Sequence, residues 1–180
     1  MKSTINEGVD MGEKFVEENG AYQIDCSKAI WATDEIHEVY HKAGVQLKDC
    51  DFLVEDNESI YLIEYKNANI NNAENPNAFK PEEDKMLNKV VQKFYDSLHY
   101  LYLAEKKKPI KYIYVLEYPK GDVVTRKRLR NKMKQRLPFE LQDSFGTGKK
   151  LIDKVEVLSI EEWNTHEKYG MFPITQVAAV

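Results

Sequence analysis

The chain has 180 residues, with 26 Lys or Arg against 30 Asp or Glu, and its formal net charge at pH 7 is −4. Hydrophobic residues make up 42% and charged residues 31%, which is typical of a single water-soluble globular domain. No apolar run approaches the roughly 20 residues of a membrane helix, and the N-terminus lacks the apolar core of a secretory signal. Because the chain has only two cysteines, we expect free thiols and a cytoplasmic protein. Because it has no apolar run of membrane length, we expect no membrane partner.

The first 44 residues predict few regular elements. Residues 1–20 are weakly patterned and predict a loose arm or a short helix, and residues 22–25 predict a short strand. Residues 27–43 predict a helix, because Ser27 can cap its first turn and apolar side chains recur at helical spacing. These side chains are Ala29, Ala32, Ile36, Val39 and Ala43. Gly44 follows, where helices often end on a left-handed residue.

Residues 45–67, VQLKDCDFLVEDNESIYLIEYKN, predict a β-hairpin, because two runs of β-favouring residues flank the turn-like stretch DNES. The second run, residues 60–66, is apolar on both faces until its end. That pattern is typical of an interior strand.

The hairpin predicts a cluster of charged side chains. Side chains alternate faces along a strand, so Glu64 and Lys66 point to the same side. If residues 57–58 form a two-residue loop, Asp51 lies opposite Glu64; a shift of two residues in loop length would place Asp49 there. Two carboxylates that close repel each other unless a cation lies between them, and oxygen ligands suit Mg²⁺ or Mn²⁺. Such an ion can polarise a phosphoryl oxygen and lower the pKa of a bound water, which Lys66 could orient.

After the hairpin, the Asn- and Pro-rich stretch 67–80 predicts a loop. The remaining patterns predict a long helix over 81–106, a strand over 111–118, a basic helix over 122–136, a strand over 155–158 and a short helix over 159–167 that begins with a capping box. Together with the hairpin, this order predicts an α/β fold with a mixed central β-sheet flanked by helices on both faces.

Asp51, thirteen residues before Glu64, and the triplet Glu64-Tyr65-Lys66 at the end of an apolar strand resemble the PD-(D/E)XK nuclease superfamily. The order helix, hairpin, helix, strand over about 27–118 also resembles the restriction endonuclease-like core of that superfamily. The resemblance implies that Asp51, Glu64 and the backbone carbonyl of Tyr65 bind Mg²⁺ or Mn²⁺. It further implies that Lys66 positions or activates the attacking water.

The resemblance also points to accessory side chains on two predicted helices. Many members place a glutamate on the first helix, where Glu35 flanks the apolar stripe and Glu38 points nearly opposite it; we prefer Glu35. Some members carry Gln and Tyr on the helix after the lysine strand. Gln92 and Tyr95 lie there, one residue closer together than the usual spacing. Cys50 stands where the family often has proline.

Residues 125–136, TRKRLRNKMKQR, hold seven basic residues and no acidic one. An apolar stripe of Leu129, Met133 and Leu137 would leave the Arg and Lys side chains facing outward. There they could bind nucleic-acid phosphates through salt-sensitive contacts that do not depend on sequence. The candidate contacts are Arg126, Lys127, Arg128, Arg130 and Lys134. A solvated helix face is the alternative interpretation of the same run.

Two interpretations compete with a metal site. Glu64 and Lys66 could end a strand in solvent, with Asp51 an ordinary surface residue. Against this, apolar residues occupy both faces of the strand, and buried charge is costly unless it is paired or metal-bound. An unrelated α/β enzyme would instead place Asp51 and Lys66 far apart.

These patterns together predict a Mg²⁺-dependent nuclease that acts on DNA, with RNA left open. Residues 27–118 would form its core, residues 1–20 an arm, and residues 119–180 a basic helix with a strand and helix after it. A chain this short has little room for a separate recognition domain, so a homodimer or a partner protein could supply specificity. The alternative is a catalytically inactive nuclease-like fold that acts as a binding or assembly module.

Overall fold

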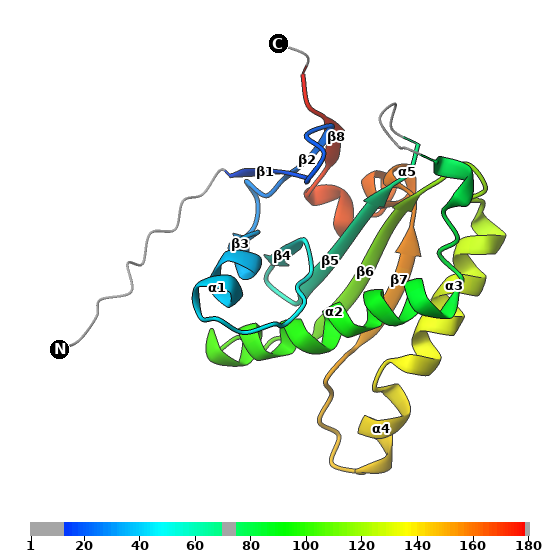
Figure 1. The fold of residues 1–180 in the computed structure, drawn as a ribbon. Helices are drawn as coiled ribbons and strands as arrows, with labels where there is room; N and C mark the ends of the chain where they lie inside the picture. Colours follow the sequence, from blue (N-terminus) through cyan, green and yellow to red (C-terminus); the bar gives the residue numbers. More distant parts are fainter. Residues whose placement is uncertain (1–12, 70–74, 179–180) are drawn as a thin grey trace.

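The computed structural model describes residues 13–69 and 75–178, which form an α/β structure with two sheets (Figure 1). The larger sheet has the strand order β3-β4-β5-β6-β7. These strands are β3 (Trp31–Thr33), β4 (Phe52–Glu55), β5 (Ile60–Asn67), β6 (Ile110–Glu117) and β7 (Lys154–Leu158). The β3–β4 and β4–β5 pairs are antiparallel, whereas β5–β6 and β6–β7 are parallel. The expected α/β class with a mixed central sheet is therefore confirmed.

The smaller sheet is antiparallel and has β2 at its centre. It contains β1 (Lys14–Val16), β2 (Tyr22–Asp25) and β8 (Ile174–Gln176). The expectation of a loose arm or helix before residue 20 is wrong for residues 14–16, while residues 1–12 lie outside the described part of the chain. Strand β1 pairs with β2, and its Phe15 is buried in one apolar cluster with Ile24 and with Ile174, a packing partner from the other end of the chain. No local pattern reveals such a partner.

Helices cover both faces of the larger sheet. They are α1 (Ile36–Lys42), α2 (Asp84–Leu103), α3 (Val123–Arg136), α4 (Phe139–Ser144) and α5 (Ile160–Thr165), with 3₁₀ turns at Pro76–Ala78 and Tyr169–Met171. One apolar core joins α1, α2 and α3 to one sheet face, and a second joins α5 and the small sheet to the other face (Figure 1). None of the helices in the described part of the chain has both the length and the apolarity to cross a membrane.

The helix expected over 27–43 forms only in its second half. Residues 31–33 pair with β4 as strand β3, and α1 begins at Ile36 with Glu35 in its N-cap position. Ser27 caps no helix; its backbone N–H donates to Asp25 Oδ1 at 2.9 Å. The backbone hydrogen bonds available at the edge of β4 override the helical spacing of the apolar residues.

The C-terminal end of α1 lies where the sequence predicts it. Gly44 has a φ of +69°, a left-handed conformation that glycine adopts without steric penalty. Its N–H donates to His41 O at 3.0 Å, and the N–H of Val45 donates to Tyr40 O at 3.2 Å. These two bonds satisfy the last helical carbonyls and turn the chain toward β4.

The hairpin has the expected register. Glu55 pairs with Ile60, and the N–H of Asp56 donates to Ser59 O at 3.0 Å, so residues 57–58 form the loop. Strand β5 is buried along its length except at Lys66, as an interior strand should be. Counting back from this turn places Asp51, just before β4, opposite Glu64.

The loop before β4 is fixed to α2 by two hydrogen bonds. The N–H of Lys48 donates to Asp96 Oδ2 at 2.8 Å, and the N–H of Cys50 donates to Ser97 Oγ at 3.0 Å. Both acceptors are buried on α2. These bonds hold the loop that carries Asp51 against the helix.

Ser97→Ala should lower the free energy of unfolding by about 1–2 kcal/mol, because the buried N–H of Cys50 loses its partner. Urea denaturation monitored by circular dichroism measures this. Ser144→Ala, which removes an exposed hydroxyl bonded to Leu141 O, is the control and should change stability by less than about 0.5 kcal/mol. Equal losses in the two variants would contradict the role of Ser97.

Candidate active site

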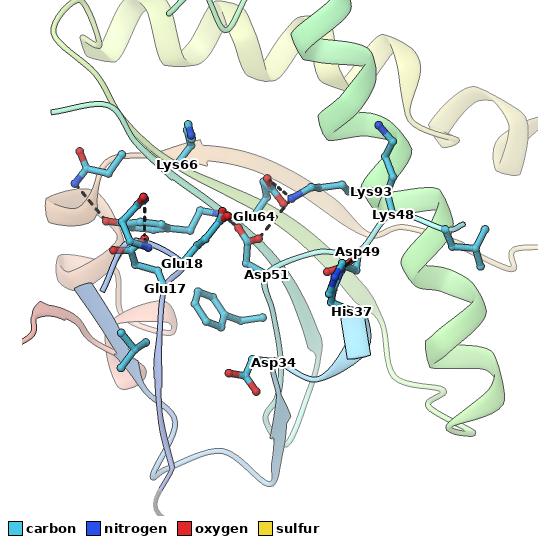
Figure 2. A pocket seen from close by; sticks show the side chains of 16 residues that line it. Glu17, Glu18, Asp34, His37, Lys48, Asp49, Asp51, Glu64, Lys66 and Lys93 are labelled. Carbon is cyan, nitrogen blue, oxygen red and sulfur yellow. Dashed lines mark hydrogen bonds and ion pairs between the residues drawn. The ribbon is translucent and has the colours of Figure 1, made fainter. Parts of the chain in front are cut away.

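A cleft of about 660 Å³ opens where the N-terminal end of β4 and the C-terminal end of β5 approach α2 and the β1–β2 turn. Acidic side chains outnumber lysines along its walls (Figure 2). The charged and histidine residues that line it are Glu17, Glu18, Asp34, His37, Lys48, Asp49, Asp51, Glu64, Lys66 and Lys93.

Asp51 and Glu64 meet at one ammonium group in this cleft. Lys93 Nζ lies 2.8 Å from Glu64 Oε1 and 3.4 Å from Asp51 Oδ1 (Figure 2). The second oxygen of Asp51 accepts a hydrogen bond of 2.7 Å from the N–H of Tyr65. The hairpin register thus brings the two acids together, and Lys93 of α2 bridges them.

Glu64 is the member of this group whose ionised form is least favoured. It is buried, and its Oε2 has no hydrogen-bond partner among the described residues. Burial, with the nearby charge of Asp51, raises the pKa of Glu64 to about 8 despite the opposing effect of Lys93. Burial also raises the pKa of Asp51. One ammonium therefore compensates the two carboxylates only in part.

Lys93 keeps its charge in this setting. Burial by itself would lower the pKa of Lys93, but the charges of Glu64 and Asp51 outweigh it and raise the pKa above its ordinary value. No motif in the sequence singles out this lysine. The signal that was present is its position beside the buried stripe of α2, next to Phe94 and one turn before Ser97.

Lys66 lies on the same face of β5 as Glu64, as strand alternation predicts. Its side chain is exposed, and Figure 2 shows it extending away from the carboxylates of Asp51 and Glu64. It forms no ion pair with any residue in the described ranges 13–69 and 75–178. The lysine expected from the motif therefore lines the cleft without touching the acids, and Lys93 contacts them instead.

The accessory residues expected on α1 lie outside the cleft lining. Glu35 is exposed at the start of α1, and Glu38 is exposed and pairs with Lys42 at 3.1 Å. The cleft-lining residues of this segment are Asp34 and His37 instead. The late start of α1 explains the difference, because it changes which positions face the hairpin.

The accessory pair expected on α2 is engaged elsewhere. Gln92 donates to Asp96 Oδ1 at 2.6 Å, and the hydroxyl of Tyr95 donates to Arg136 O at 2.9 Å. Neither lines the cleft. Asp49, the alternative carboxylate of the hairpin, does line it and lies 3.2 Å from His37 Nδ1.

Glu17 is a buried acid of the cleft wall that the sequence analysis missed. Its carboxylate accepts hydrogen bonds of 2.8 Å from the N–H groups of Asn19 and Ala21 in the turn between β1 and β2. Its oxygens are thus already satisfied by the backbone. Glu17 shapes this wall of the cleft and is a poor candidate for chemistry.

The donor set around Glu64 suits a hard divalent cation. Along β5 the N–H groups of Ile60 and Ala68 donate toward β6, so the odd-numbered Tyr65 directs its N–H and carbonyl to the side of Asp51. Two carboxylates and this carbonyl are oxygen ligands of the kind Mg²⁺ takes, with water or substrate completing the shell. Within the described residues, no group of three or more His, Cys, Asp or Glu side chains could hold a metal. A bound ion would therefore depend on water or substrate for the remaining positions.

The basic helix α3 divides into a structural part and a free part. Arg126 is buried, and its Nε donates to Glu162 Oε2 at 2.8 Å, so the expectation that every Arg and Lys faces outward is wrong for it. It lies one turn before Leu129, on the same stripe.

The other basic side chains of α3 are more exposed. Arg128 is exposed and pairs with Glu82 at 2.7 Å. The basic side chains without an acidic partner among the residues that the structure describes include Lys127, Arg130 and Lys134.

A scan against models of protein families, a search of curated proteins and a search of solved structures each found no match to this chain.

In the metal-free protein, the free energy of unfolding should fall as the pH rises from about 4.5 toward about 8. Folding raises the pKa of Glu64, so the native state holds a proton that the unfolded chain releases above about pH 4.5. That stabilisation is complete below the unfolded pKa and is lost as the pH rises through the folded one, with a slope of at most about 1.4 kcal/mol per pH unit.

Urea denaturation at several pH values, with a chelator present, tests this dependence. Glu64→Gln should flatten the slope, because the amide mimics the protonated acid and does not titrate. The exposed Glu38→Gln is the control and should keep the wild-type slope. The expectation fails if wild type and Glu64→Gln have the same slope over this range.

Proposed function

We propose that this chain is a Mg²⁺- or Mn²⁺-dependent nuclease of the PD-(D/E)XK kind, with a restriction endonuclease-like core, which hydrolyses phosphodiester bonds of DNA. The observation that carries this proposal is the convergence of Glu64 Oε1 and Asp51 Oδ1 on one cation position. The free Glu64 Oε2 and the Tyr65 carbonyl add oxygen donors beside it. Acids whose negative charge is only partly compensated, and which line a cleft, are typical of functional sites.

In this proposal Asp51, Glu64 and the Tyr65 carbonyl hold the metal, which would polarise a phosphoryl oxygen and lower the pKa of a water. The protein's own residues supply the positioning. The N–H of Tyr65 orients Asp51, and burial under α2 holds Glu64. Two ammonium groups can orient the attacking water and stabilise developing negative charge. These are Lys66 at the rim, the lysine of the motif, and Lys93 beside the acids.

The charge of the cleft explains why a cation is needed for a phosphate substrate. Acidic side chains predominate around Asp51 and Glu64, so a phosphodiester would be repelled without a divalent ion. Affinity for the rest of the polyanion is assigned to the free basic side chains of α3, and a homodimer or partner protein would add specificity. Cys26 and Cys50 are both free and buried, which suits the reducing cytoplasm.

Asp51→Asn and Glu64→Gln should each lower the cleavage rate by more than about 100-fold, because each removes a charged metal ligand. The measurement is Mg²⁺- and Mn²⁺-dependent cleavage of plasmid and single-stranded DNA at matched protein concentration. Glu38→Gln, an exposed acid outside the cleft, serves as control and should cleave at the wild-type rate. The proposal fails if the wild type shows no metal-dependent cleavage, or if Glu64→Gln cleaves as fast.

Replacing Lys127, Arg130 and Lys134 together by Ala should weaken DNA binding and reduce its salt dependence. Each lost phosphate contact lowers the slope of log K against log salt by about 0.9 for duplex DNA. Fluorescence anisotropy of labelled DNA over a salt series measures this slope. As a charge-matched control, the exposed Lys28, Lys42 and Lys107 are replaced by Ala. An equal change of slope in both triple variants would remove α3 as the contact surface.

The second candidate function is a non-catalytic module that binds nucleic acid or assembles with a partner. The contact of Lys93 with both acids favours it, because the carboxylates are then partly neutralised without a metal. The direction of Lys66, away from the pair, favours it as well. DNA binding that persists in a chelator, together with no cleavage at any Mn²⁺ concentration, would select this candidate.

A further inference from the structure

The ammonium of Lys93 occupies the position that a metal shared by the two acids would need. Its Nζ contacts Glu64 Oε1 at 2.8 Å and Asp51 Oδ1 at 3.4 Å. An Mg²⁺ ion binds oxygen at about 2.0–2.1 Å and would be repelled by an ammonium group in contact with the same two oxygens. The two cations therefore compete for these oxygens.

Of the three side chains, Lys93 is the one that can move. The Glu64 side chain is 9% exposed, whereas those of Lys93 and Asp51 are 27% and 33% exposed. Asp51 is held by the N–H of Tyr65. Lysine carries its charge on a flexible four-carbon stem, and the cleft gives that stem a path toward solvent.

Charge balance favours an exchange of one cation for the other over simple loss of the ammonium. A buried carboxylate beside a partly buried one is destabilising when neither has a counter-ion. Asp49 adds further negative charge nearby and contributes to the raised pKa of both acids. Arrival of a divalent ion compensates this charge as the ammonium leaves.

We propose that Lys93 is the resident counter-ion of Asp51 and Glu64, that a divalent cation binds by displacing its ammonium group, and that Lys93 thereby lowers the metal affinity of the site. The inference rests on the proposed function in taking Asp51 and Glu64 as metal ligands. It adds a regulatory property: the site is stable when metal-free and needs a higher concentration of the ion to fill.

Calorimetric titration of the full chain with Mn²⁺ tests this exchange. Lys93→Met should bind Mn²⁺ at least about 10-fold more tightly than the wild type, because the ion no longer displaces an ammonium group. Lys48→Met removes the same charge from an exposed cleft residue and should stay within about threefold of the wild type. Without divalent ions, the melting temperature of Lys93→Met should fall by about 5 °C or more, and saturating Mn²⁺ should restore it.

Lys93→Gln provides a second variant if Lys93→Met does not fold without metal, because the amide can still donate to Glu64.

An Mn²⁺ affinity of the folded Lys93 variants equal to or below that of the wild type would overturn the inference. Absence of Mn²⁺ binding in every protein would overturn it too. Tighter binding in the Lys93 variants, without Glu64-dependent DNA cleavage, would support the inference and reject only the nuclease. Glu64-dependent cleavage with an unchanged affinity in those variants would reject only the inference.

Discussion

Two carboxylates forced together in a poorly solvated place are the constraint on which the candidate site depends. The β4–β5 register places Asp51 opposite Glu64, and the helices that cover β5 bury Glu64. Two acids in such a place need a counter-charge, or one of them holds a proton. Lys93 supplies it from α2, and the bonds of Asp96 and Ser97 to the preceding loop fix the helix against the hairpin. The compensation of the two acids therefore depends on how α2 packs against the hairpin.

The other end of the same hairpin shows what full compensation looks like. Glu55, at the end of β4, is buried and contacts Lys106 Nζ at 2.7 Å and Lys108 Nζ at 2.9 Å. Burial by itself would raise the pKa of Glu55, but the two lysines outweigh it and lower that pKa. Glu64 has one lysine and a neighbouring acid, and its pKa moves in the opposite direction. Only the cleft end of the hairpin retains a deficit of positive charge.

Much of the hairpin and of the later helices follows from the sequence, because their determinants are local. A two-residue loop and a strand period of two fix the register, which in turn sets Asp51 against Glu64. Capping chemistry fixes the start of α3 at Asp122 and of α5 at Ser159. Strands β1, β3 and β8 could not be predicted in this way. Strands β3 and β8 pair with strands distant in the chain, and β1, although it pairs with the nearby β2, packs its Phe15 in the same apolar cluster as Ile174 of β8.

The sequence by itself determined that Asp51 and Glu64 come together, because the register of the hairpin depends on neighbouring residues only. Tertiary structure decided which lysine meets that charge. Strand alternation puts Lys66 on the correct face, but its exposed side chain is free to extend into solvent. Lys93 reaches the acids because α2 packs across the hairpin with that position turned inward. The same holds for Arg126 of α3, which a run of basic residues cannot distinguish from its neighbours until Glu162 folds against it. The partner of a charged side chain depends on how elements pack across long stretches of chain, and that packing is absent from any local pattern.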